Sequence, residues 1–214
     1  MILYIQQTKT NFNMEWLVSK GDELICKAEA PFERGQFRTS FRYCDNREQS
    51  TYFNPMDTSF GRGLAERMSF KIFEAGGHIG HIVGRTQKTG KFFGAYPYYE
   101  FMYLGEEYRG YEVGFGSRGL FICFYKGDTL LAVADKQLRV VNFKDVYTAY
   151  IEDENIVPLF IPFLMYYDVT QHGDVMDIAV ASIQHKRVDT IQKELIAKYD
   201  PSFIPRIQGL ENTN

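Results

Sequence analysis

The chain has 214 residues, of which 45% are hydrophobic and 24% charged, and a formal net charge of −3. This composition predicts one globular domain, and the acidic balance argues against nucleic acid as a partner. Three scattered cysteines (Cys26, Cys44 and Cys123) without CxxC spacing favour a reducing cytoplasm over a disulfide scaffold. The opening MILYIQQTKTNF has neither the basic start nor the apolar core of a signal peptide, so no export or membrane insertion is expected.

The first part of the chain reads as a meander of short strands. The high content of aromatic residues, 18 Phe and 15 Tyr, favours strands over helices. Strand-like segments separated by turn residues occupy 2–6, 15–18, 23–28, 36–44 and 51–53. The alternation is clearest over 36–44, where Arg38 and Arg42 share one face and Phe37 and Phe41 the other. The polar stretch 45–67 predicts a long connection around the short strand 51–53.

From residue 68 onward, turn signals recur at hairpin spacing. They delimit strands at 69–73, 79–85, 91–95, 98–104, 108–115, 120–126, 129–134, 137–141 and 145–151, with Pro97 predicted as a break between two of them. The whole chain therefore holds about a dozen strands.

The segment 156–167, IVPLFIPFLMYY, is apolar on every side. As a helix it would be roughly 18 Å long, too short to span a bilayer, so we expect a helix buried in the core. Asn155 is the expected N-cap, Pro158 falls in the first turn, and Pro162 predicts a kink or a later helix start. A strand is the competing interpretation, but two prolines would confine it to an edge, which contradicts complete burial.

These elements together predict a mainly β fold, a closed antiparallel barrel of about twelve strands. A barrel of that size is too wide to be filled by its own side chains, and the helix at 156–167 is the segment able to fill it.

The remaining segment, 175–199, has the apolar spacing of an amphipathic helix that ends at Asp200-Pro201. We expect it to pack on the barrel, with self-association or a protein partner as alternatives. The predicted organisation is a single domain over 1–214, with a C-terminal helical extension over 175–214.

Three stretches resemble the tubby C-terminal-like superfamily, which includes LURP-one-related proteins, phospholipid scramblases and small bacterial tubby-like proteins. MSFKIFEAGGHIGHIVGR is similar to a strand, glycine turn and strand of the family, GLFICFYKGDTLLAVADK to a later hairpin, and IVPLFIPFLMYYD to its helix ending in an acidic residue. The resemblance covers about residues 1–168. It implies a helix-filled barrel and, from animal tubby proteins, phosphoinositide binding through basic residues. The cysteine-rich and membrane-associated features of scramblases are absent.

No residue pattern indicates catalysis, a metal or a cofactor. GFGSRG at 114–119 matches the dinucleotide pattern GxGxxG, but a strand follows it where a helix is required, so a hairpin turn is expected. His78 and His81 lack a third ligand and are expected to be ordinary strand residues. Cys26 and Cys123 are expected in the core, and no GxSxG occurs. Carboxylate pairs such as Glu106-Glu107 are expected to be solvated charges.

Basic residues form the candidate binding site, for an anionic lipid headgroup. On the residues alone they are more simply explained as the ordinary charges of a solvated barrel face. The candidates are Arg38, Arg42, Arg85, Lys88 and Lys91.

The predicted function is a non-enzymatic binding or scaffold protein of tubby-like type, cytoplasmic or peripheral at a membrane, that binds an anionic phospholipid or a protein partner. The alternative is a small-molecule-binding or enzymatic barrel with a pocket near one end of the helix, lined by Tyr and His side chains.

Overall fold

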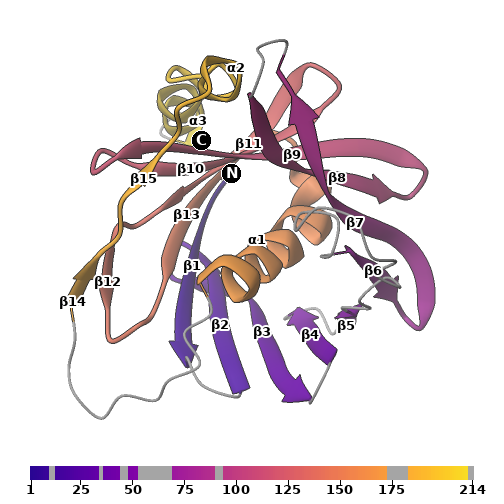
Figure 1. Ribbon diagram of the computed structural model, residues 1–214. Coiled ribbons are helices and arrows are strands. Elements are labelled where there is room, and N and C mark those ends of the chain that lie inside the picture. The colour runs from indigo at the N-terminus through magenta and orange to yellow at the C-terminus, as the bar shows by residue number, and fades with distance from the viewer. Residues whose placement is uncertain are drawn as a thin grey trace.

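The computed structural model describes residues 1–9, 13–33, 36–43, 48–52, 69–89, 94–172 and 183–211. Within these ranges, thirteen strands form one large sheet, two more form a small ribbon, and all strand pairings are antiparallel. Helices are few, and the largest lies among the strands (Figure 1). The predicted mainly β class with few helices is confirmed.

The strands follow the predicted order closely. Those before residue 75 are β1 (Ile2–Lys9), β2 (Asn13–Lys20), β3 (Glu23–Glu33), β4 (Gln36–Tyr43), β5 (Glu48–Tyr52) and β6 (Ser69–Glu74). Those that follow are β7 (Gly77–Lys88), β8 (Ala95–Tyr103), β9 (Glu106–Gly116), β10 (Leu120–Lys126), β11 (Thr129–Lys136), β12 (Arg139–Val141) and β13 (Val146–Ile151). The predicted break at Pro97 is wrong, because Pro97 lies within β8. The predicted strand 91–95 falls mostly on residues outside the described ranges.

Consecutive strands from β1 to β11 pair with one another along the chain. Strand β13 then pairs with β11 on one side and with β1 on the other. The ladders therefore lead from β1 through β11 and β13 back to β1. Figure 1 shows these strands arranged around the long helix.

That helix is α1 (Val157–His172), entered through a single turn of 3-10 helix at Glu154–Ile156. The predicted helix over 156–167 is confirmed and continues to His172. The predicted cap at Asn155 is wrong, because Asp153 accepts a hydrogen bond from the backbone N–H of Asn155. The 3-10 turn moves the cap two residues upstream. Pro162 lies inside the helix, and Pro158 is in its first turn, where a missing N–H costs little.

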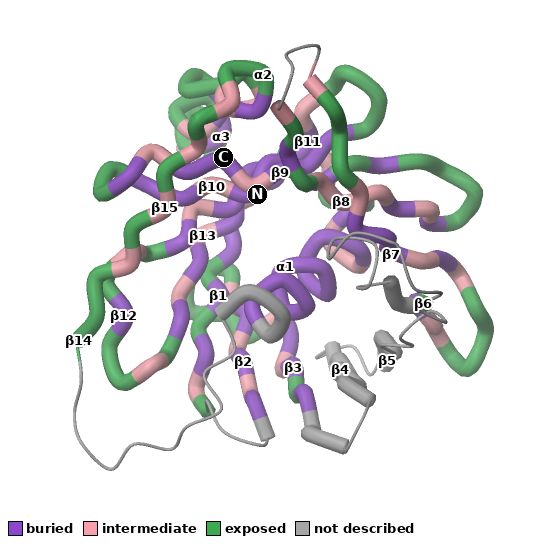
Figure 2. The backbone as a smooth tube through the Cα atoms, viewed as in Figure 1, coloured by how far each residue is buried: buried purple, intermediate pink, exposed green. Residues whose placement is uncertain are grey.

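Side chains of α1 lie in the main hydrophobic core together with side chains of the strands. From Leu159 to Asp168, the residues for which an exposed fraction is given are at most 2% exposed, and Figure 2 shows this part of α1 as buried throughout. They pack against buried side chains from strands on all sides, including Leu3 of β1, Ile82 of β7 and Phe124 of β10. The interior is therefore hydrophobic core.

The predicted amphipathic helix over 175–199 is wrong for its described part, which begins at residue 183. This part contains β14 (Ile183–His185), β15 (Val188–Asp189) and α2 (Lys193–Ile196), and α3 (Phe203–Glu211) follows. Strand β14 pairs with β12, and β15 pairs with β9. Pairing with these two strands overrides the helical periodicity. We call residues 183–211 the C-terminal strap.

The C-terminal strap covers part of the outer face of the sheet, over β9, β10, β11 and β13, and Figure 1 places α2 and α3 outside the sheet. Leu195, Phe203 and Ile207 of the strap form a second core with residues of β9, β10, β11 and β13. Cys123 lies in this outer core and Cys26 in the inner one, so both cysteines are buried as predicted. Burial on both faces explains the nearly continuous apolar run LFICFY of β10.

Candidate functional site

The predicted basic residues lie on two separated strands. Arg38 is in β4, and Arg85 and Lys88 are in β7, with β5 and β6 between them. Three inter-strand spacings put the two backbones roughly 14 Å apart across a flat sheet. The ladders align Arg38, through β5 and β6, with His81, so Arg85 lies four residues further along β7. The two groups therefore do not lie side by side on neighbouring strands.

The predicted basic residues also differ in whether a carboxylate already pairs with them. Arg85 donates through Nε and Nη2 to Glu100 Oε1, at 3.2 and 3.0 Å, so its charge is already compensated. Lys88 is exposed, and no described carboxylate pairs with it. Lys91 and the side chains of Arg38 and Arg42 lie outside the described part of the chain. The anion site made from these residues remains a prediction.

His78 and His81 lie in β7, and the glycine pattern lies at the turn between β9 and β10. Burial lowers the pKa of His81, and the ring of His78 packs against Phe73 at a centroid distance of 5.5 Å. Among the described residues, no group of three or more metal-binding side chains occurs. GFGSRG ends β9 and forms the turn into β10.

A second cationic surface was not found from the sequence. Strands β12 and β14 form a two-stranded ribbon in which Arg139 and His185 are direct cross-strand partners. Lys144 follows the turn at the end of β12. The side chains of Arg139, Lys144 and His185 are all exposed. Within the described ranges, none of the three forms an ion pair with a carboxylate. We call residues 139–144 and 183–185 the β12–β14 ribbon.

Exposed apolar side chains lie beside Arg139, Lys144 and His185 in this ribbon. Val141 and Ile183 are cross-strand partners and are 44% and 57% exposed. The turn that follows Val141 places Asn142 and Phe143 at φ of +52° and +59°. Two consecutive positive φ values are typical of a type I′ hairpin turn, but a phenylalanine in this conformation is uncommon. The ribbon could not be predicted from the sequence, because its strands are about 40 residues apart and the second one falls within the helix predicted over 175–199.

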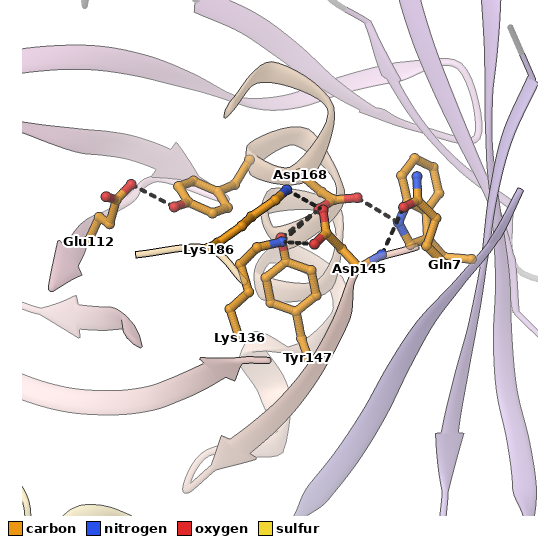
Figure 3. A network of polar contacts seen from close by, with 9 residues as sticks. Gln7, Glu112, Lys136, Asp145, Tyr147, Asp168 and Lys186 are labelled. Carbon is orange, nitrogen blue, oxygen red and sulfur yellow. Dashed lines mark hydrogen bonds and ion pairs between the residues drawn. The ribbon is translucent and has the colours of Figure 1, made fainter. Parts of the chain in front are cut away.

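A buried polar cluster lies at the end of α1 (Figure 3). Asp168 accepts hydrogen bonds from Trp16 Nε1 at 3.0 Å and from the Tyr147 hydroxyl at 2.6 Å. Lys136 Nζ lies 3.3 Å from Asp168 Oδ1 and 2.7 Å from Asp145 Oδ1. The C-terminal strap contributes Lys186, whose Nζ is 3.4 Å from Asp145 Oδ2. We call these six residues the buried cluster.

Burial and charge shift these groups in different directions. Burial raises the pKa of Asp168 to about 6, although Lys136 opposes this shift. Burial would also raise the pKa of Asp145, but Lys136 and Lys186 hold it below its ordinary value. Burial lowers the pKa of Lys136. The side chains of Lys136, Asp145 and Asp168 are at most 2% exposed, so a substrate could not reach them. The cluster therefore links strands, helix and strap.

No family model, curated protein or solved structure matches this chain. Among the described residues, no helix is both long enough and apolar enough to cross a membrane.

Proposed function

We propose that this chain is a non-enzymatic binding or scaffold protein of the tubby-like type, built as a closed barrel around α1. The cycle of strand pairings, the apolar helix after the last barrel strand and Asp168 near the end of that helix support the proposal. The observation that carries it is the packing of α1. Because the side chains from Leu159 to Tyr167 lie in the core, a ligand is expected on the outer surface.

The alternative of a small-molecule or enzymatic barrel receives less support. It requires Tyr and His side chains around a pocket near one end of the helix. Tyr147 and Tyr167, at that end, are buried and donate hydrogen bonds to Asp168 and Glu112, so both hydroxyls are already engaged.

An anionic lipid headgroup is the ligand that the exposed charges favour. The β12–β14 ribbon combines the cations Arg139 and Lys144, beside His185, with exposed Val141 and Ile183. Cations beside apolar side chains suit the surface of an anionic membrane, where charges meet headgroups and apolar groups enter the interface. Such a protein would act in the cytoplasm, peripherally at a membrane. Lys88, with the other basic residues predicted from the sequence, is the alternative candidate for the headgroup site.

Vesicle co-sedimentation at low salt tests this proposal. Neutral vesicles should leave the protein in solution, whereas vesicles containing phosphatidylserine or phosphoinositide should sediment it. Arg139→Glu with Lys144→Glu should reduce sedimentation at least tenfold if the ribbon is the site, and Lys88→Glu should do so if the predicted residues are. Lys20→Glu, an exposed charge elsewhere, is the control. Absence of binding by the native protein would overturn the lipid proposal and leave a protein partner.

A further inference from the structure

The sheet forks between β8 and β9. Their ladder runs from Tyr103 opposite Glu106 to Tyr99 opposite Gly110 and stops there, although both strands continue. Continuation of the register would place Pro97 opposite Glu112. Proline has no N–H to donate, so the ladder cannot continue at this position.

The direction of the backbone groups supports this cause. The N–H of Phe115 bonds to Gly119, on the β10 side, whereas both backbone groups of Gly114 bond to Thr190. Since backbone groups along a strand alternate in direction, those of Glu112 point into the fork, as those of Gly114 do. A continued ladder would therefore need residue 97 to donate its N–H to Glu112, and Pro97 has no N–H.

The C-terminal strap enters this fork as an added strand. Val188 and Asp189 pair with Gly116 and Phe115. Gly114 N donates to Thr190 Oγ1 at 2.8 Å, and Thr190 N donates back to Gly114 O at 2.9 Å. On the other side of the fork, Gln192 Nε2 donates to the carbonyl of Ala95 in β8 at 3.1 Å. The strap thus bonds to both strands of the fork.

Two glycines of β9 make room for the strap. A Cβ atom on Gly114 would lie 2.3 Å from the Val188 carbonyl oxygen. Gly116 has φ +67°, and its Cβ would lie 2.6 Å from Asp189 Oδ1. Because the backbone of the strap lies this close to β9, position 114 must be a glycine. We call the edge of β9 from Gly114 to Gly116, with which β15 pairs, the strap slot.

Contacts beyond the slot are specific to this strap. The ring of Tyr199 stacks on Phe121 at 4.3 Å between centroids and meets Phe115 edge-on at 5.3 Å. The Tyr125 hydroxyl donates to the carbonyl oxygen of Lys198 at 2.7 Å.

Charge complementarity also selects the strap. Without Lys186, the buried cluster would hold two carboxylates, Asp145 and Asp168, against the single cation Lys136. The far end of the strap places Glu211 3.4 Å from the amino group of Met1. Without a strap, the face that it covers would therefore lack the partner charges of Asp145 and of the Met1 amino group.

We propose that the strap slot and the outer face around it form an interaction surface for the C-terminal strap of a second copy of this chain, so that two copies exchange residues 183–211. Only a segment of the same sequence reproduces the ladder, the ring stack and the Lys186 ion pair together. Residues 173–182 separate α1 from the strap. Ten residues can span up to about 35 Å when extended, which is enough to reach a neighbouring barrel.

Exchange would also change the β12–β14 ribbon, because β14 belongs to the strap. Arg139 and Lys144 would come from one copy and His185 from the other, and a dimer would carry two such ribbons. This consequence rests on the proposed lipid-binding function, whereas the exchange itself does not.

Disulfide trapping tests the exchange. Phe115 and Asp189 are direct partners whose backbone groups do not bond to each other, so their Cα atoms should be about 4.5 Å apart, within disulfide range. Phe115→Cys is placed on one tagged chain and Asp189→Cys on a differently tagged chain, both with Cys44→Ser. The two are co-expressed, oxidised and separated by non-reducing electrophoresis. A covalent dimer carrying both tags, in at least a tenth of the chains, is expected.

The control carries both cysteines on one chain, where a strap bound to its own barrel gives an intrachain bond. An intrachain bond in this control, without any mixed-tag dimer and with a monomer mass by light scattering, would overturn the proposal. No bond in either arrangement would also overturn it, because the strap would then not occupy the slot. Vesicle binding is measured separately, so failure of the lipid proposal does not affect this result.

Discussion

Lys186 Nζ lies 3.4 Å from Asp145 Oδ2, and this ion pair joins the C-terminal strap to the polar interior of the sheet. Asp145 is held from the opposite side by Gln7, whose backbone N–H donates to the Asp145 carbonyl and whose Oε1 accepts from the Asp145 N–H. A surface segment is thus connected through one residue, Asp145, to β11 by its carboxylate and to β1 by its backbone.

Replacement of Lys186 by Met should weaken strap docking. The change leaves Asp145 and Asp168 with Lys136 as the single cation of the buried cluster, and loss of one hydrogen-bonding partner of a buried group costs about 1 to 3 kcal/mol. Limited proteolysis should cleave the strap about ten times faster. Arg187→Met is the matched control, because Arg187 is 72% exposed and pairs with Asp189 at the surface. Equal cleavage rates in the two variants would contradict the role of Lys186.

The pKa of Asp168 predicts a specific pH dependence. Its ordinary value is 3.8 and its folded value is about 6. Between these values the folded chain holds a proton that the unfolded chain has lost, so the contribution of this group to stability falls as pH rises from 4 to 6. The cost is about 3 kcal/mol above pH 6 and absent below pH 4.

Asp168→Asn removes this titration. The free energy of unfolding of the wild type, measured by urea denaturation and expressed relative to the variant, should therefore decrease between pH 4 and pH 6 and then stay level. A difference that is constant with pH would show that Asp168 is not the titrating group.

Gly114→Val should expel the strap from its slot. The new side chain would meet the carbonyl oxygen of Val188, which cannot move without breaking the ladder. Hydrogen exchange of amides at 188–196 should accelerate at least tenfold, while α1 amides remain protected. Gly209→Ala in α3 is the control, because nothing lies within 4 Å of its added Cβ, and alanine should strengthen the helix. If the amides at 188–196 of Gly114→Val exchange their hydrogens at the wild-type rate, the slot geometry is contradicted.

Truncation of Phe163 should test the role of α1 as core. The ring is fully buried and packs edge-on against Phe101 at 4.7 Å and Tyr99 at 5.1 Å. Phe163→Ala should lower the free energy of unfolding by about 3 to 5 kcal/mol. Leu104→Ala, at a residue 66% exposed, should change it by less than about 0.5 kcal/mol. Similar losses in both variants would mean that α1 does not fill the interior.

The local sequence was sufficient to predict an element whose own residues determine where it lies in the fold. The stretch from Ile156 to Tyr167 is apolar on every side, so it could only be buried, and the helix was predicted within a few residues. Strands bounded by glycine turns were also predicted, because turn chemistry acts over two to four residues.

Long-range pairing could not be predicted in the same way. Val188 and Asp189 form a strand because β9 offers an edge whose Gly116, the partner of Val188, lies 72 positions earlier. Pro97 is accepted inside β8 because that side of the strand faces the fork, which depends on β9. Lys136 and Asp145 look like ordinary charged residues near turns, and only the assembled sheet brings them to the end of α1.

The hydrogen bond between Trp16 and Asp168 joins residues 152 positions apart. Strands β1 to β13 precede α1 in the chain, so during synthesis their core-facing apolar side chains stay uncovered until the helix has been made. Contacts of such long sequence separation slow folding and prolong the exposure of apolar surface. This order of synthesis predicts that the nascent chain depends on chaperones until about residue 170 has left the ribosome.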